Sequence, residues 1–268
     1  MGLLYAAVNR LLGFKPGQEG KVTGLAAHGN ADRALAVFEK LISWDLSKKR
    51  IENKSLSFGY SSIKVLEREL AQFSKADIAA GVQAHLEQSV VSQVKKQFAD
   101  HPTIPRRLYV AGGVFANVSL NRRLAEDLEA ELYVCPNMGD GGLGLGAALL
   151  THDQPVDFSS LYLGDEAGSV SEHLLETSPV ACSIHDSGSM SDIAATDISS
   201  GKVIAVARGR MEFGPRALGN RSILARADDR SINQWLNNRL SRTEFMPFAP
   251  IVRDVDASEY FVLRQDRK

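Results

Sequence analysis

The sequence RLYVAGGVFANVSLNRRLAEDL, residues 107–128, carries the clearest fold signal in this chain of 268 amino acids. Its first five residues are typical of a β-strand, two adjacent glycines mark a tight turn, and apolar spacing from Val118 onward predicts a helix. In such an arrangement, bare backbone N–H groups and a helix N-terminus can hold an anion. We therefore expect a cradle for a nucleotide or its phosphates, with Gly112 and Gly113 at the turn.

The same layout repeats directly downstream. Residues 132–134 are typical of a strand, residues 136–140 of a loop, and residues 142–150 of a helix rich in small side chains. Two strand-turn-helix units in tandem predict an α/β layer whose turns open together at the carboxyl ends of the strands. Asp140 ends the second loop. It can cap the following helix or serve as an oxygen ligand for a divalent metal, and the spacing alone leaves both functions open.

The first hundred residues predict mainly helices. The opening segment 5–14 is typical of a short helix, and residues 31–43 predict another, capped by Asn30. Residues 74–77 resemble a capping box at the start of a long amphipathic helix. The segment 16–29 contains four glycines and predicts a loop.

The sequence also suggests one anion contact, two further strands and one further helix. Lys21, within the glycine-rich segment, is a natural contact for an anion, although an ordinary loop is an equally good interpretation. A short strand is expected near residues 56–60 and another at residues 201–207. Residues 231–240 predict a helix in which Trp235 belongs to the core.

Charge changes sharply along the second half of the chain. Residues 151–200 contain nine acidic residues and no lysine or arginine, whereas residues 208–242 contain eight arginines and three acidic residues. The first of these segments is typical of a linker. We expect one domain over residues 1–163, and a linker with a second domain over residues 164–268.

The arginine stretch, GRMEFGPRALGNRSILA at residues 209–225, is the strongest candidate binding motif. Arg210, Arg216 and Arg221 lie among three glycines, a proline and Glu212. Guanidinium groups match the oxygens of carboxylates and phosphates, and glycines allow a backbone to approach such a ligand closely. A solvated charge run is the alternative, but the interleaved apolar residues argue against it.

Composition excludes several classes of protein. The formal net charge of −1 gives no global attraction to nucleic acid, and Phe213 is the single aromatic residue within the arginine stretch, so nucleic-acid binding is disfavoured. Cys135 and Cys182 are too few for a disulfide framework. No uncharged apolar run approaches the ~20 residues of a spanning helix. We expect a soluble, cytoplasmic protein without a membrane partner.

Four segments, in order along the chain, resemble motifs of the O-carbamoyltransferases of antibiotic and nodulation-factor biosynthesis. The arginine stretch is the most specific of them, and the glycine turns are less so. The matching segments are Glu19–Ala26, Ala111–Asn117 with Asn121, Gly139–Gly142 with Gly146–Ala148, and the arginine stretch running on to Phe248–Pro250.

This resemblance implies an α/β enzyme with a partial actin-like domain, like that of the tRNA threonylcarbamoyl-transferring proteins, followed by a partial YrdC-like domain. In the family, carbamoyl phosphate is activated with ATP as carbamoyl-adenylate. The carbamoyl group then passes to a hydroxyl of a small-molecule acceptor with the help of an iron-type divalent metal. The resemblance therefore implies carbamoyl phosphate, ATP and a hydroxyl acceptor as partners, although no motif identifies the acceptor.

Site residues follow from the resemblance, position by position. It implies a catalytic group whose arginines hold phosphate or carbamoyl oxygens, a group that lines the nucleotide site, and one metal ligand. These are Arg210, Arg216, Arg221 and Glu212 in the first group, Lys21, Gly112, Gly113, Asn117 and Gly141 in the second, and Asp140 as the metal ligand.

The chain departs from the family pattern at the metal site. Members carry a histidine pair at helical spacing in an N-terminal lobe, and none of the six histidines here forms such a pair. We therefore expect an incomplete metal site and a partner chain that supplies the missing lobe. The alternative to a carbamoyltransferase, or a core fragment of one, is a non-catalytic remnant or subunit that binds nucleotide or carbamoyl phosphate.

Overall fold

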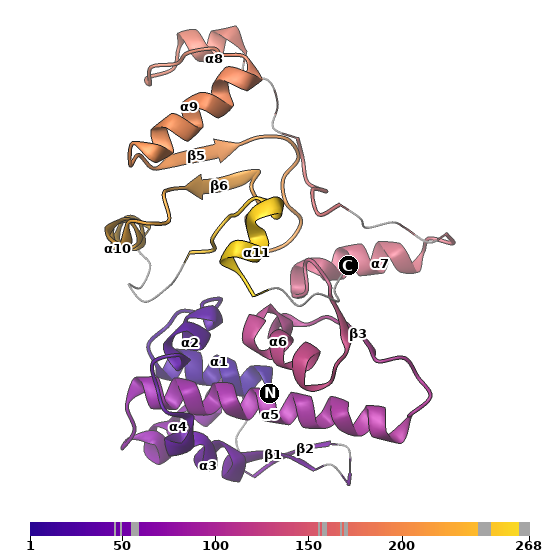
Figure 1. Cartoon of the computed structure of the whole chain (residues 1–268). Helices are drawn as coiled ribbons and strands as arrows, with labels where there is room; N and C mark the ends of the chain where they lie inside the picture. Colours follow the sequence, from indigo (N-terminus) through magenta and orange to yellow (C-terminus); the bar gives the residue numbers. More distant parts are fainter. Residues whose placement is uncertain are drawn as a thin grey trace. The chain divides into compact units, whose positions relative to one another are not determined.

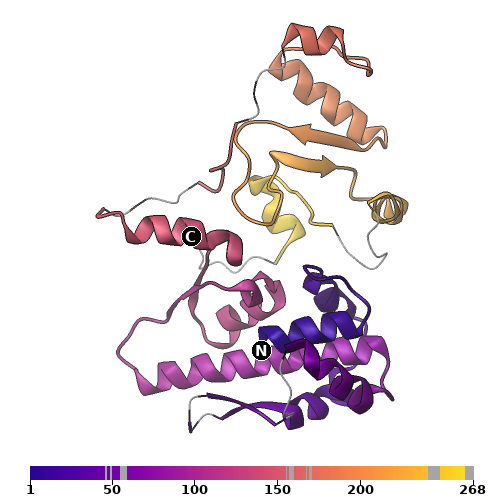
Figure 2. The same cartoon turned by 180° about the vertical axis from the view of Figure 1, so that it is seen from behind.

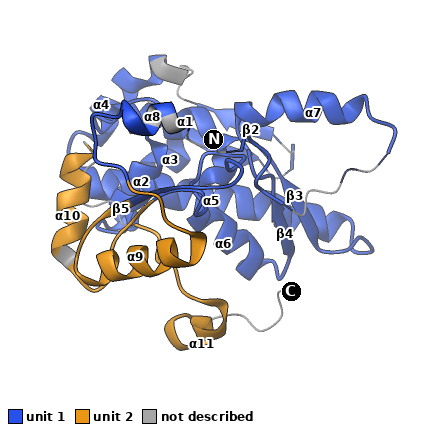
Figure 3. Cartoon of the chain, turned by 90° about the horizontal axis from the view of Figure 1, so that it is seen from above, with its two compact units in different colours: residues 1–182, 205–222 blue, residues 183–204, 223–268 orange. Residues whose placement is uncertain are grey.

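The computed structural model describes the chain apart from a few short segments, and it divides into two compact units (Figure 3). The first unit comprises residues 1–182 and 205–222, and the second comprises residues 183–204 and 223–268. The residues outside the description are 46, 49, 55–58, 155, 157–159, 167, 169–170, 241–247 and 263–268.

Most of the secondary structure, labelled in Figure 1, lies in the first unit, which Figure 3 colours blue. Its helices are α1 (Gly2–Leu11), α2 (Glu19–Ala26), α3 (Ala31–Leu41), α4 (Ile63–Leu70), α5 (Lys75–Asp100), α6 (Val118–Asp127), α7 (Leu143–Leu150) and the short α8 (Glu172–Glu176). Its strands are β1 (Ile42–Asp45), β2 (Arg50–Asn53), β3 (Arg107–Val110) and β4 (Glu131–Val134). The second unit holds α9 (Ser187–Ser199), α10 (Arg230–Arg239) and α11 (Ala257–Tyr260), and the paired strands β5 (Ile204–Ala207) and β6 (Arg221–Leu224) cross the unit boundary.

The long helix α5 organises the first unit (Figures 1 and 2). It packs against α1, α2, α3 and α6. Apolar side chains from all of these helices, together with α4, form one buried core, and a fully buried side chain of this kind stabilises the fold by ~1.5–3 kcal/mol. The largest members of this core are Val8, Val22, Phe38, Leu66, Leu70, Val82, Leu120 and Leu124.

The start of α5 is fixed by hydrogen bonds that the capping pattern predicted in part. The Ser74 hydroxyl accepts from the N–H of Asp77 at 3.1 Å, which confirms the expected cap. The buried Asp77 carboxylate in turn accepts from the N–H of Asn30 at 2.8 Å and from Arg33 at 3.0 Å. These bonds join the beginning of α5 to the beginning of α3. Asn30 caps α3 as expected, accepting from the N–H of Asp32.

Strands β3 and β4 pair in parallel, with Leu108 opposite Leu132. The predicted α/β character and both strand-turn-helix units are therefore confirmed. The helix α7 that follows β4 is apolar along its length, yet it has no buried residue within the described structure, and the ring of Tyr109 on β3 is 76% exposed.

Several expectations were wrong. The glycine-rich segment 16–29 contains α2 rather than a loop throughout, because Val22 is fully buried against the core and this burial outweighs the low helix propensity of glycine. Trp235 is 54% exposed and not a core residue. The short hairpin of β1 and β2 and the helix α9 were not predicted.

The strand expected near residues 56–60 falls mainly on residues that the structure does not describe, and residues 59–60 begin a short 3-10 helix. Of the helices in the described part of the chain, none combines the length and apolar character that a membrane span needs.

Replacing Leu124 with alanine should lower the free energy of unfolding by roughly 3 kcal/mol, because the side chain is fully buried and its removal leaves a cavity. Urea denaturation measures this loss. Leu150→Ala is the matched control, since Leu150 is 90% exposed, and it should change stability by less than about 0.5 kcal/mol. Equal losses in the two variants would contradict the packing described above.

Candidate functional site

The glycine turn after β3 and the loop after β4 meet, as the tandem layout predicted. Gly112 has a φ of 108°, a conformation that L-residues with a side chain rarely adopt. Its N–H donates to the carbonyl of Met138 at 2.5 Å, which joins the two turns. The space beside the Gly113 Cα is open, with no atom within 4 Å of an ideal Cβ position. A ligand can therefore approach this backbone closely.

Asn117 lies at the end of this turn and faces the protein interior, with a side chain that is nearly fully buried. Its Oδ1 accepts from the N–H of Leu120 at 3.1 Å and so caps α6. Its Nδ2 donates to Gln83 Oε1 at 2.8 Å and to Thr23 Oγ1 at 3.3 Å. Asn117 thus connects the glycine turn to α5 and α2.

Lys21 lies on α2, the helix that Asn117 contacts through Thr23. The Lys21 ammonium lies 5.8 Å from the centre of the Phe14 ring, within reach of a cation–π interaction. It forms no ion pair with any carboxylate in the described part of the chain. Its charge is therefore available to an anionic ligand.

The loop after β4 presents Asp140 to solvent. The cap positions of the short 3-10 helix and of α7 are occupied by Gly139 and Gly142, so Asp140 does not cap α7. Gly142 has no alternative to glycine, because a Cβ there would lie 2.2 Å from the carbonyl oxygen of Asn137. A Cβ on Gly141 would likewise lie 2.8 Å from the Asn137 side chain, so this turn is closely packed.

Asp140 by itself does not make a metal site. Within the described residues, no group of three or more histidine, cysteine, aspartate or glutamate side chains is arranged to hold an ion. A single exposed carboxylate supplies one oxygen ligand, whereas protein-bound transition metals take several ligands from the polypeptide. The side chains that the structure describes therefore do not fit a complete divalent-metal centre.

Glu212 shapes the arginine loop, which we define as residues 208–221. Its side chain is 8% exposed, and its Oε1 accepts three backbone N–H bonds, from Leu218 at 2.8 Å, Asn220 at 2.7 Å and Arg221 at 3.1 Å. Burial raises the pKa of this carboxyl, but the backbone donors outweigh burial and lower its pKa from 4.5 to about 2. The buried Glu212 carboxylate thus holds the backbone of the arginine loop in one conformation.

The three predicted arginines have different surroundings. Arg221 donates to the carbonyls of Arg208 at 2.7 Å, Asn220 at 2.9 Å and Gly209 at 3.3 Å, so it holds the loop together.

Arg210 donates to the Leu163 carbonyl at 3.2 Å. Arg216 is exposed and has no hydrogen bond or ion pair with any residue that the structure describes. It is the arginine most available to a ligand.

A segment that the sequence suggested was linker pairs with the arginine loop. The N–H of Gly164 donates to the Met211 carbonyl at 3.0 Å, and the N–H of Phe213 donates to the Leu161 carbonyl at 2.7 Å. Tyr162 was not predicted as a site residue, yet its hydroxyl donates to the Leu218 carbonyl at 2.9 Å. No motif in the acidic segment signals this pairing.

The arginine loop also packs against the loop after β4, and both belong to the first unit. Gly214 has a φ of 125°, and a Cβ there would lie 2.5 Å from the carbonyl oxygen of Pro136. The structure thus brings the loop that carries Arg216 next to the loop that carries Asp140. The glycine turn at Gly112 joins the same loop through Met138.

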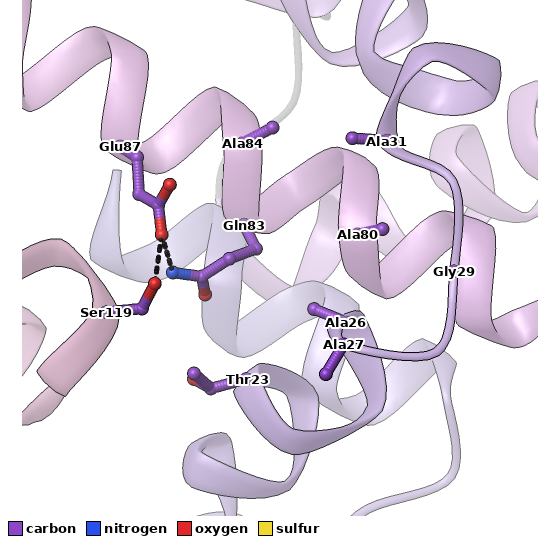
Figure 4. A pocket seen from close by; sticks show the side chains of 10 residues that line it. All are labelled: Thr23, Ala26, Ala27, Gly29, Ala31, Ala80, Gln83, Ala84, Glu87 and Ser119. Carbon is purple, nitrogen blue, oxygen red and sulfur yellow. Dashed lines mark hydrogen bonds between the residues drawn. The ribbon is translucent and has the colours of Figure 1, made fainter. Parts of the chain in front are cut away.

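A pocket of about 420 Å³ lies between α2, α5 and the start of α6 (Figure 4). Its polar side is formed by Gln83, whose Nε2 donates to Glu87 Oε1 at 2.7 Å, and by Ser119, whose hydroxyl donates to the same oxygen at 2.6 Å. Neither Gln83 nor Glu87 was predicted from the sequence. The remaining lining residues are small or hydroxylated: Thr23, Ala26, Ala27, Gly29, Ala31, Ala80 and Ala84.

Replacing Glu212 with glutamine should loosen the arginine loop, because a neutral amide accepts backbone N–H bonds more weakly than a carboxylate does. We expect trypsin to cut after Arg216 roughly tenfold faster, as mass spectrometry of the peptides would show. Glu131→Gln, at an exposed carboxylate, is the control and should leave this rate unchanged.

A comparison of wild type with Glu212→Gln over a range of pH tests the same hydrogen bonds. Glu212 has a lower pKa in the folded loop than in the unfolded chain, so its stabilising effect is complete above about pH 4.5 and is lost as the pH falls toward 2. The difference in urea stability between wild type and Glu212→Gln should shrink over this range. A constant difference would contradict the assigned hydrogen bonds.

Comparison with known proteins identifies the family. The domain described as the carbamoyltransferase N-terminus matches residues 1–149, and the carbamoyltransferase C-terminus matches residues 195–268. The chain is 32% identical to nodulation protein NolO of Bradyrhizobium diazoefficiens, over 98% of this chain and 50% of that protein. It is 33% identical to an uncharacterized protein of Methanocaldococcus jannaschii, over 94% of this chain and 50% of that protein.

A relative with an activity in its name is 3'-hydroxymethylcephem-O-carbamoyltransferase of Streptomyces clavuligerus. It is 31% identical over 58% of this chain and 29% of its own length. The chain spans about half the length of the curated relatives that match it over most of its residues. These similarities show that the chain belongs to the carbamoyltransferase family.

Proposed function

We propose that this chain carries out, or forms the core of an enzyme that carries out, O-carbamoyl transfer. Carbamoyl phosphate is activated with ATP as carbamoyl-adenylate, and the carbamoyl group passes to a hydroxyl of a small-molecule acceptor. Family membership and the named cephem O-carbamoyltransferase support the reaction class. The observation that carries the proposal is the arginine loop, in which Glu212 and Arg221 fix the backbone and leave Arg216 free.

The chemistry requires such a loop. Activation consumes carbamoyl phosphate, ATP and water, and it releases phosphate, pyrophosphate and carbamoyl-adenylate. The reactants carry several negative charges, which repel one another unless cations and backbone donors offset them. Arg216 would contact phosphate or carbamoyl oxygens. Arg210 and Arg221 would add positive potential while their hydrogen bonds to carbonyls keep the loop in shape.

The glycine turn supplies the second part of the proposed site. Gly112 and Gly113 would let nucleotide phosphates approach the backbone, with Gly141 in the adjoining turn and Lys21 on α2 as a further cation. We assign residues 1–163 to a partial actin-like domain and residues 164–268 to a linker and partial YrdC-like domain. The parallel pairing of β3 and β4 at the glycine turn supports the first assignment.

Asp140 would contribute one ligand to an iron-type divalent metal. Because the described side chains do not complete that site, we derive no step through the metal. The curated relatives are about twice as long as the matched region, and we propose that the remaining ligands come from polypeptide equivalent to that additional length, within one chain or from a partner chain.

A pyrophosphate-release assay with ATP and carbamoyl phosphate tests the proposal without an acceptor. Wild type should release pyrophosphate only when both substrates are present. Arg216→Ala should lower the rate roughly 100-fold, because the loop loses its free cation. Arg122→Ala is the matched control, since Arg122 is an exposed arginine that pairs with Glu126 on α6, and it should keep the wild-type rate.

The assay also separates the two candidate functions. Binding of ATP or carbamoyl phosphate in calorimetry without pyrophosphate release would identify a binding subunit. Absence of both binding and release would refute the activating role, and an unchanged rate in Arg216→Ala would remove that residue from the site.

A further inference from the structure

Gln83 is the centre of a closed network of buried hydrogen bonds. Its Oε1 accepts from the Tyr5 hydroxyl at 2.7 Å and from Asn117 Nδ2 at 2.8 Å. Its Nε2 donates to Glu87 Oε1 at 2.7 Å and to Asn117 Oδ1 at 3.1 Å. Both protons and both acceptor positions of the Gln83 amide are therefore used, and the side chain is 7% exposed.

The ends of the network determine the orientation of both amides. The Glu87 carboxylate pairs with Arg123 and only accepts hydrogen bonds, so the NH₂ group of Gln83 must face it. At the other end, the N–H of Leu120 only donates, so the carbonyl oxygen of Asn117 must face α6. These two requirements agree, and they leave Gln83 and Asn117 as a complementary pair with two hydrogen bonds between them.

The same network reaches α2. The Tyr5 hydroxyl gives its proton to Gln83, so the Thr23 hydroxyl donates to the Tyr5 oxygen, at 2.8 Å, and accepts from Asn117 at 3.3 Å. Burial raises the pKa of Tyr5, which keeps this proton in place at all ordinary pH values. The network thus ties α1, α2, α5 and α6 to one residue at the end of the glycine turn.

Glu87 is the anionic end of the network. It accepts from Ser119 at 2.6 Å and pairs with Arg123 at 3.3 Å, so its charge is balanced although its side chain is only 11% exposed. Ser119 and Arg123 both lie on α6. Glu87 therefore links α6 to the same face of α5 that carries Gln83, as Figure 4 shows for Ser119.

We propose that Gln83 is a positioning residue for the nucleotide-binding turn. It acts through Asn117, whose buried amide caps α6 at the end of the short 3-10 helix Gly113–Ala116, and it thereby sets where the backbone N–H groups of the turn point. This inference rests on the proposed function, because it concerns the ATP site assigned there. It assigns to Asn117 a role in holding the turn rather than in contacting the nucleotide through a free side-chain atom.

Gln83→Met is the direct test, since methionine has a similar length and cannot replace the four hydrogen bonds. Calorimetry with magnesium and ATP should show at least a tenfold weaker affinity than wild type. Val82→Ala is the matched control, because Val82 is a buried apolar residue of the same helix outside the network. It should destabilise the protein in urea while leaving the ATP affinity unchanged.

Hydrogen exchange gives a readout that does not depend on ATP. The amides of residues 112–120 should exchange at least tenfold faster in Gln83→Met than in Val82→Ala, when both are compared with wild type. A double-mutant cycle with Asn117→Ala adds a second check, since the two substitutions should be strongly non-additive in exchange rate.

The outcomes separate the two proposals. If wild type binds ATP and Gln83→Met binds it equally well, Gln83 is not a positioning residue. If wild type does not bind ATP, the proposed nucleotide site fails, and the exchange rates alone decide the role of Gln83. In either case, the inference would be overturned if the amides of residues 112–120 exchanged no faster in Gln83→Met than in Val82→Ala.

Discussion

The arrangement of this protein depends on buried side chains that accept backbone N–H bonds. Asp77 receives the N–H of Asn30, Asn117 receives that of Leu120, and Glu212 receives three in the arginine loop. An acceptor that is buried without a donor costs a few kcal/mol, so each of these groups forces the adjacent backbone into one shape. Helix starts and turns that would otherwise sample many conformations are fixed by these bonds.

The same constraint explains how much of the fold could be predicted. The strands around the glycine turn and the helices α5 and α6 follow from local periodicity and from caps within three residues. The helix α2 does not, since its formation depends on burying Val22 against helices elsewhere in the chain. The Gln83–Asn117 pair spans 34 positions, and no sequence pattern indicates which of several polar residues will meet at that distance.

The candidate site was likewise predictable from the sequence only in part. The sequence predicts the glycine turn, Asp140 and the arginine stretch, because unusual residues at close spacing are visible in it. It does not distinguish the tasks of the arginines, which depend on which carbonyls the folded loop brings near each guanidinium. The backbone hydrogen bonds of Glu212 are not visible in the sequence either, and Tyr162 was missed because its segment has the composition of a linker.

The hydrogen bonds of Arg221 have a consequence for substitution by lysine. Two nitrogens of its planar guanidinium reach the carbonyls of Arg208, Gly209 and Asn220, which are spread around the loop. A lysine ammonium is one compact point of charge and cannot reproduce that spread. Lysine at position 216 would keep an exposed positive charge, whereas lysine at position 221 would leave loop carbonyls without their donors. The two positions therefore tolerate the same conservative exchange very differently, although the sequence presents them as equivalent arginines.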